Sequence, residues 1–214
     1  MRVLGVDFTS APSARKPISC AVASFDGHHL KLLELVNWCS FDEFAAALAE
    51  PGPWIAGMDF PFGQSRRFIE NIGWPRHWDE YIRKVEALDR KEFRQALEAY
   101  KEDRPAGDKH HRRACDRLSR SQSPQTLYGT PVGLMFFEGA PRLLQSGVHL
   151  PFHHDGDRSP SRRKQASKLF EFSATIVFGE RLDVAVLRRL HRMCVDFRYG
   201  CKSSRPGKMD YNFG

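Results

Sequence analysis

Short apolar runs separated by turn residues characterise the first part of the chain. The Asp26-Gly27 pair between the second and third runs is typical of a β-hairpin turn. Residues 40–50 follow a helical spacing, with Ser40 as a candidate N-cap and Glu43 completing a capping box. A helix at this point predicts a crossover and a mixed sheet. In such a sheet with the strand order 3-2-1-4, the first and fourth strands would lie side by side. The runs that we predict as strands are residues 2–8, 18–25, 30–38 and 54–60.

A strongly helix-forming region follows the fourth predicted strand. Residues 77–103 carry apolar side chains at helical spacing, which predicts two helices or one long broken helix. Residues 104–125 have the composition of a polar connection that runs into a short basic helix. These segments together predict a helical insertion after the fourth strand, covering approximately residues 64–125.

The rest of the chain is more interrupted. Residues 126–151 are punctuated by Gly and Pro and contain an apolar stretch that ends at Glu138. Residues 174–180 predict one more strand, and residues 181–197 predict an amphipathic helix. We therefore expect residues 1–214 to form a single α/β domain, with a mixed sheet flanked by helices and enough length to bury a core.

The composition narrows the class of protein. Hydrophobic residues make up 41% of the chain, and no apolar run approaches the roughly 18 residues of a membrane span, so we expect no membrane partner. The start of the chain lacks a signal-peptide pattern, and the five cysteines are scattered without CxxC spacing, which indicates reduced thiols and a cytoplasmic location. The net charge of +7 favours polyanionic partners, nucleic acid above all, although many soluble proteins are modestly basic.

Two aspartates stand where the first and fourth predicted strands end. Asp7 lies in GVDFTSAP and Asp59 in AGMDFPFG, each after an apolar run and before a turn. Taken singly, each is well explained as a turn aspartate that bonds to its own turn. Taken together on neighbouring strands, they form a pair of carboxylates that repel one another unless a cation lies between them. Carboxylate oxygens suit Mg²⁺ or Mn²⁺, and such a site supports in-line displacement at phosphorus.

Four motifs resemble, in their order along the chain, those of a known family: GVDFTSAP, AGMDFPFG, HRRACDR and FFEGAPRLL. The family is called domain of unknown function 429, and its members are regarded as predicted nucleases of the ribonuclease H-like superfamily. The resemblance covers about residues 2–150. It implies a ribonuclease H-like mixed sheet in the order 3-2-1-4-5, with Asp7 and Asp59 as metal ligands. It also implies that Arg113 and Asp116 form a further polar pair near the site.

The chain departs from the family pattern towards its end. Relatives carry a Glu-x-x-Pro-like motif on a late strand and then a final acidic helix, whereas residues 155–214 are divergent or incomplete in this respect. A further catalytic carboxylate must therefore come from elsewhere. The candidates are Glu138, Asp116, Asp183 and Asp196.

Adjacent histidines occur at three places, 28–29, 110–111 and 153–154. Neighbouring side chains on a strand point to opposite faces, so such pairs rarely bind one metal ion. We expect these histidines to be exposed in loops.

Basic clusters indicate where a nucleic acid would bind. The candidates for phosphate contact are Arg112, Arg113 and Arg117 in the short basic helix and Arg162, Arg163 and Lys164 in a later loop. We therefore predict a nuclease that depends on Mg²⁺ or Mn²⁺. Two alternatives stay open. One is a catalytically impaired module that binds nucleic acid or protein on the same fold. The other is an actin- or sugar-kinase-like phosphotransferase, whose phosphate-binding motif DFTS also resembles. Such kinases repeat their fold twice, and 214 residues hold one copy, so the length of the chain argues against this alternative.

Overall fold

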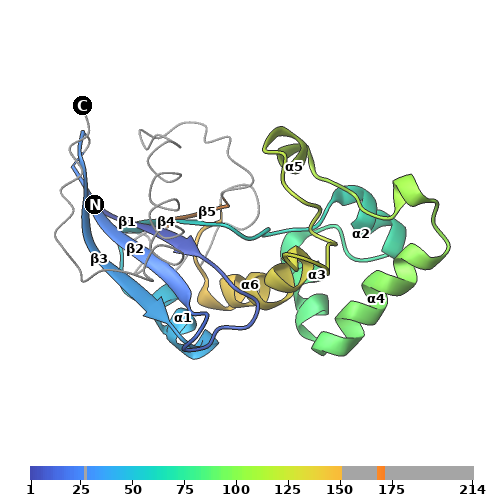
Figure 1. The fold of residues 1–214 in the computed structure, drawn as a ribbon, viewed down its shortest axis with the longest axis horizontal. Coiled ribbons are helices and arrows are strands. Elements are labelled where there is room, and N and C mark those ends of the chain that lie inside the picture. The colour runs from blue at the N-terminus through green and yellow to red at the C-terminus, as the bar shows by residue number, and fades with distance from the viewer. Residues whose placement is uncertain (27, 151–167, 172–214) are drawn as a thin grey trace.

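The protein is built on a mixed β-sheet flanked by helices, and the computed structural model describes residues 1–26, 28–150 and 168–171. Within these residues the strands are ordered β3-β2-β1-β4-β5 (Figure 1). The order predicted for the first four strands is confirmed, whereas the predicted strand 174–180 and helix 181–197 lie outside the described residues. The strands are β1 (Arg2–Asp7), β2 (Ile18–Phe25), β3 (Leu30–Trp38), β4 (Trp54–Met58) and β5 (Lys168–Glu171).

The direction of each strand follows from the way it is connected. β1 pairs antiparallel with β2, and β2 pairs antiparallel with β3. β1 and β4 run parallel, because helix α1 (Phe41–Leu48) carries the chain back across the sheet between β3 and β4. Their register places Val6 of β1 opposite Met58 of β4, so the two strands reach their carboxyl ends side by side.

Local hydrogen bonds close the hairpin and start the first helix. Asp26 Oδ1 accepts the backbone N–H groups of His29 and His28 at 2.7 and 2.8 Å, in the turn between β2 and β3. These two bonds lower the pKa of Asp26 to about 2. Ser40 Oγ accepts the backbone N–H of Glu43, so Ser40 is the N-cap of α1 as predicted.

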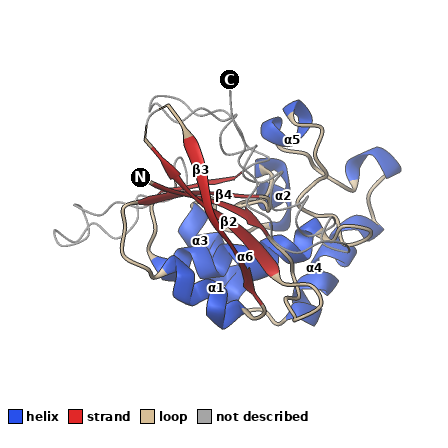
Figure 2. Cartoon of the chain, turned by 60° about the vertical axis from the view of Figure 1, so that its left-hand side comes forward, coloured by secondary structure: helices blue, strands red, loops and turns tan. Residues whose placement is uncertain are grey.

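Helices α1 and α6 (Val132–Ser146) lie on the same face of the sheet (Figure 2). Their buried side chains join those of β1, β2 and β4 in one apolar core. Gly139 of α6 faces the ring of Phe60, just beyond β4, and a Cβ on Gly139 would lie closer than 3.0 Å to three atoms of that ring. Glycine therefore allows α6 to approach the end of β4 more closely than any other residue would.

The sequence pattern does not predict α6. Gly133, Gly139 and Pro141 interrupt residues 126–151 and disfavour a helix there, yet all three lie inside the helix and are buried. Packing against helices α1 and α3 (Trp78–Glu86), in an apolar core shared with the sheet, supplies stabilisation that intrinsic helix propensity does not.

A helical lobe extends beyond the carboxyl ends of β1 and β4 (Figure 1). The predicted region 77–103 forms two helices, which settles the choice between two helices and one broken helix. The short basic helix is also present, whereas helix α2 was not among the predictions. No helix of the described residues is long and apolar enough to cross a membrane. The lobe comprises α2 (Arg66–Ile72), α3 (Trp78–Glu86), α4 (Arg90–Glu102), the short η1 (Ala106–Asp108) and α5 (Ala114–Leu118).

Candidate functional site

The structure brings the two predicted aspartates to the same edge of the sheet. Asp7 is the last residue of β1, and Asp59 directly follows the last residue of β4. Because Val6 lies opposite Met58 in parallel register, Asp7 and Asp59 occupy the next matching positions of adjacent strands. The backbone N–H of Phe8 donates to Asp59 Oδ1 at 2.7 Å, which ties the carboxylate of Asp59 to the residue after Asp7. Asp7 is 5% exposed.

Two neighbouring carboxylates are a donor set that fits Mg²⁺ or Mn²⁺. Mg²⁺ is commonly held by one or two carboxylates, with water and substrate phosphate supplying the other oxygens. Within the part of the chain that the structure describes, no group of three or more His, Cys, Asp or Glu is placed to hold a metal ion. Among the residues whose side chains the structure describes, Asp7 and Asp59 are therefore the carboxylates that this edge of the sheet offers as metal ligands.

Arg113 and Asp116 form the predicted polar pair, in which Asp116 is buried and Arg113 partly buried. The Asp116 carboxylate accepts from Arg113 Nη2 at 2.6 Å, from Nε at 2.9 Å and from the backbone N–H at 2.8 Å. Arg113 Nη1 donates to the carbonyl oxygen of Gly63 at 3.1 Å. The pair therefore fastens α5 to the DFPFG segment that begins at Asp59. In this arrangement Asp116 positions Arg113, because both its carboxylate oxygens are engaged by that residue.

Glu138 lies in α6 and is engaged by two arginines. Arg90 Nη1 donates to Glu138 Oε1 at 2.7 Å, and Arg142 Nη1 lies 3.1 Å from Glu138 Oε2. The same Arg90 nitrogen donates to the carbonyl oxygen of Ser10 at 2.8 Å. Arg90 thus connects Glu138 to the turn that follows Asp7. This connection holds the turn against α6.

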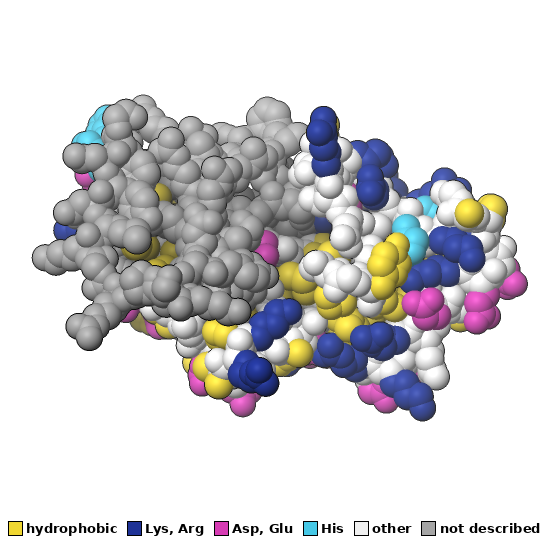
Figure 3. Space-filling view, in the orientation of Figure 1, with side chains coloured by type: hydrophobic (Ala, Val, Ile, Leu, Met, Phe, Trp, Pro, Cys, Tyr) yellow, Lys and Arg dark blue, Asp and Glu magenta, His cyan; other side chains and the backbone are white. Residues whose placement is uncertain are grey.

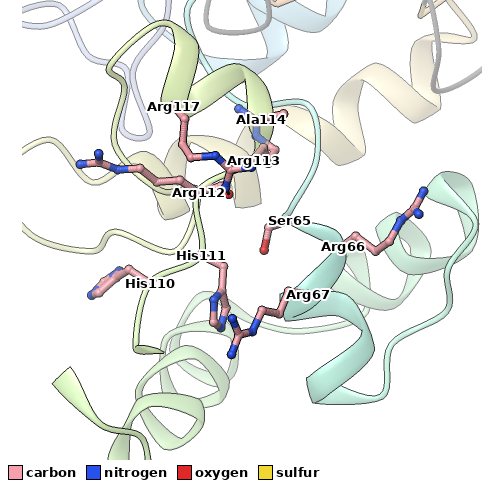
Figure 4. Close-up of a pocket in the computed structure, with 9 residues that line it drawn as sticks. All are labelled: Ser65, Arg66, Arg67, His110, His111, Arg112, Arg113, Ala114 and Arg117. Atoms are coloured by element: carbon pink, nitrogen blue, oxygen red, sulfur yellow. Dashed lines mark hydrogen bonds between the residues drawn. The ribbon is translucent and has the colours of Figure 1, made fainter. Parts of the chain in front are cut away.

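A pocket of about 770 Å³ lies in the helical lobe, between the start of α2 and the segment that leads into α5 (Figure 4). Figure 4 shows the two segments facing one another, with the hydroxyl of Ser65 pointing into the space between them. The pocket unites the predicted Arg112, Arg113 and Arg117 with residues that were not predicted to act. The added lining residues are Ser65, Arg66, Arg67, His110, His111 and Ala114.

The positive charge of this pocket is only partly balanced by the residues that the structure describes. Arg113 pairs with Asp116, and Arg67 pairs with Asp108, each with an N–O distance of 2.6 Å. Figure 3 shows Lys and Arg side chains gathered around histidines on this face of the lobe. In the described part of the chain, no carboxylate lies within 4.0 Å of the guanidinium groups of Arg66, Arg112 and Arg117.

The histidines of the pocket correct the expectation that they are exposed. His111 is 7% exposed, its Nε2 lies 2.6 Å from the Tyr100 hydroxyl, and its backbone N–H donates to Gln125. His110 is half-buried, and its ring meets that of Tyr128 edge to face, with the centroids 5.9 Å apart. Burial lowers the pKa of both histidines below the usual 6.5, so both are neutral at neutral pH.

The sequence predicted one of the two segments that line the pocket. The basic run at 112–117 was visible as a cluster, but Arg66 and Arg67 belong to a segment that lies far away in the sequence. A signal for them was present, since the Ser-Arg-Arg of residues 65–67 closely follows the DFPFG motif. The predicted Arg162, Arg163 and Lys164, and the candidates Asp183 and Asp196, lie outside the described residues. No protein-family model, no curated protein and no solved structure matches this chain.

Proposed function

We propose that the chain is a metal-dependent nuclease of ribonuclease H-like type, which hydrolyses phosphodiester bonds of nucleic acid. The observation that carries the proposal is the placement of Asp7 and Asp59 at matching positions of the parallel strands β1 and β4. The resemblance of four sequence motifs to the family of predicted nucleases points to the same two residues. The arginine-lined pocket on the neighbouring lobe supports a polyanionic substrate.

The side chains take distinct roles in this mechanism. Asp7 and Asp59 would hold Mg²⁺ or Mn²⁺, and the Phe8 N–H orients the carboxylate of Asp59. A bound ion of this kind supplies Lewis acidity and charge neutralisation at a phosphodiester. Arg113, positioned by Asp116, holds the DFPFG segment in place. Arg112 and Arg117 contribute positive charge that attracts and orients the substrate backbone.

The proposal is tested by cleavage assays with Mn²⁺ on labelled single-stranded, duplex, hybrid and junction substrates. We expect the wild-type chain to cleave at least one of them, and Asp7→Asn and Asp59→Asn to fall to the level of the buffer control. Asp42→Asn is the matched control, because Asp42 is an exposed aspartate in the first turn of α1. Titration of Mn²⁺ by calorimetry should show a site that the Asp7→Asn and Asp59→Asn double variant lacks. Cleavage that survives Asp7→Asn would contradict the assignment.

A second candidate function is a module that binds nucleic acid without cleaving it. The observation in its favour is that the basic pocket lies in the helical lobe and uses neither Asp7 nor Asp59. This candidate predicts that the wild-type chain binds oligonucleotides, that it cleaves none of the four substrates, and that Asp7→Asn binds as tightly as wild type.

A further inference from the structure

We infer that the pocket between α2 and α5 binds a phosphate group of single-stranded nucleic acid, while a base of the same strand stacks on Tyr128. The inference rests on the proposed function, from which it takes nucleic acid as the class of ligand. It goes further by assigning the contact site and the strandedness of the substrate, and by adding Arg66 and Tyr128 to the residues that bind it.

The phosphate contact follows from charge and volume. Arg66, Arg112 and Arg117 come from two distant segments, lie around one pocket, and have no carboxylate within ion-pair distance in the described part of the chain. A guanidinium presents a planar fork of donors that matches phosphate oxygens. A volume of about 770 Å³ is within the range of pockets that accept ligands of nucleotide size. Such an accumulation of cationic side chains is best compensated by an anionic ligand.

Tyr128 makes the site suitable for a single strand. Its side chain is 69% exposed, although it is a large aromatic residue. Its ring stands edge to face, at 86°, against His110, which lines the pocket. A face of the Tyr128 ring is therefore available immediately beside the phosphate site. Bases of a duplex are stacked on one another, whereas bases of a single strand are free to stack on an aromatic side chain.

The pocket is close enough to the aspartates to serve the same strand. Ser65 follows Asp59 by six positions in the sequence, so the two lie at most about 20 Å apart even if the chain between them is fully extended. At about 3.4 Å per phosphate, this distance corresponds to about six nucleotides or fewer. A strand held by its phosphate in the pocket can therefore reach Asp7 and Asp59 within a few nucleotides.

The first experiment measures the electrostatic contact. The full chain is titrated with a fluorescein-labelled oligothymidylate of about 12 nucleotides, in EDTA so that cleavage does not interfere, and the dissociation constant is followed by anisotropy as the KCl concentration is changed. Neutralisation of one phosphate in the pocket contributes about −0.7 to the slope of log K against log salt for a single strand. The triple variant with Arg66, Arg112 and Arg117 each changed to Ala should weaken binding and make the slope less negative by about this amount.

The choice of variants keeps folding apart from binding. Arg66, Arg112 and Arg117 are exposed, whereas Arg113 and Arg67 are left unchanged because their ion pairs are part of the lobe. Lys31→Ala is the matched control, since Lys31 is an exposed cation on β3, on the sheet rather than on the lobe. It should leave both the affinity and the slope unchanged. An equal loss in Lys31→Ala and in the triple variant would overturn the assignment of the site.

The second experiment tests stacking. Tyr128→Ala should weaken binding of the single strand about 5- to 150-fold, the usual effect of losing one stacked base. Tyr128→Phe keeps the ring and should bind like wild type, and a duplex of the same length should be insensitive to either change. Unchanged single-strand binding by Tyr128→Ala, or a duplex bound more tightly than the single strand, would overturn the inference.

The two proposals can fail separately. If the wild-type chain cleaves nucleic acid while the triple arginine variant and Tyr128→Ala bind it as tightly as wild type does, the assignment of the pocket is overturned and the nuclease proposal stands. Binding that responds to these variants, in a chain that cleaves no substrate, would support the pocket and overturn the nuclease.

Discussion

The contact between Gly139 of α6 and Phe60 predicts the direction in which a single methyl group changes stability. Helix propensity alone predicts that Gly139→Ala stabilises the protein by about 1 kcal/mol, because Gly is unfavourable inside a helix. The structure predicts the opposite, since the added Cβ would lie closer than 3.0 Å to three atoms of the Phe60 ring. Phe60 is fully buried, and its ring packs against those of Phe8 and Phe62, at centroid distances of 4.4 and 5.2 Å. A shift of this ring would therefore disturb the packing of its aromatic neighbours.

Overpacking of a dense core costs about 1–3 kcal/mol. We therefore expect Gly139→Ala to lower the free energy of unfolding by an amount in this range, and a loss of about 2 kcal/mol to lower Tm by about 4–8 °C in a chain of this size. Urea denaturation followed by circular dichroism measures the change, with the m value expected to stay constant. Gly107→Ala is the control, because Gly107 has open space around its Cβ position and should be neutral or slightly stabilising.

A double variant identifies the cause. If the Phe60 ring is the obstacle, Gly139→Ala combined with Phe60→Leu should be less destabilised than the two single changes together predict, by about 0.5–3 kcal/mol. A Gly139→Ala protein at least as stable as wild type would refute the close approach of α6 to the end of β4. Strictly additive effects would refute the role of Phe60.

Two further predictions concern the helical lobe. Arg113→Ala should lower the free energy of unfolding by about 3–5 kcal/mol, because it leaves the buried carboxylate of Asp116 without its cation; a loss below about 1 kcal/mol in urea denaturation would contradict this. Stability should also fall as the pH drops below about 6.5. The folded chain holds His110 and His111 at lowered pKa values, so below that pH the unfolded chain binds more protons. Urea midpoints measured across this range should vary less with pH in a variant with both histidines changed to Gln, and an unchanged pH dependence would argue against their burial.

Much of the sheet was predictable because its signals are local. The first four strand runs, the turn at Asp26 and the cap at Ser40 depend on residues a few positions apart, and each is present in the structure. The mixed character of the sheet followed from one additional rule, that a helical crossover joins parallel strands, whereas the order of the first four strands is what the family resemblance implied. Helix α6 was missed because its Gly and Pro residues disfavour a helix locally, and they are accepted only through packing against the rest of the core.

The same distinction between local sequence signals and long-range packing applies to the candidate site. The positions of Asp7 and Asp59 were readable from the chain, because the end of an apolar strand is a local feature and the parallel order of strands brings equivalent ends together. Only the segment of the basic pocket that contains Arg112 was predicted from the sequence. Arg66 lies in a separate segment, which long-range packing brings to the same pocket. The engagement of Glu138 by Arg90 and Arg142, and of Asp116 by Arg113, likewise emerged only in three dimensions. A sequence records which side chains are charged, whereas the fold decides which of those charges are neutralised by a neighbour and which stay available to a ligand.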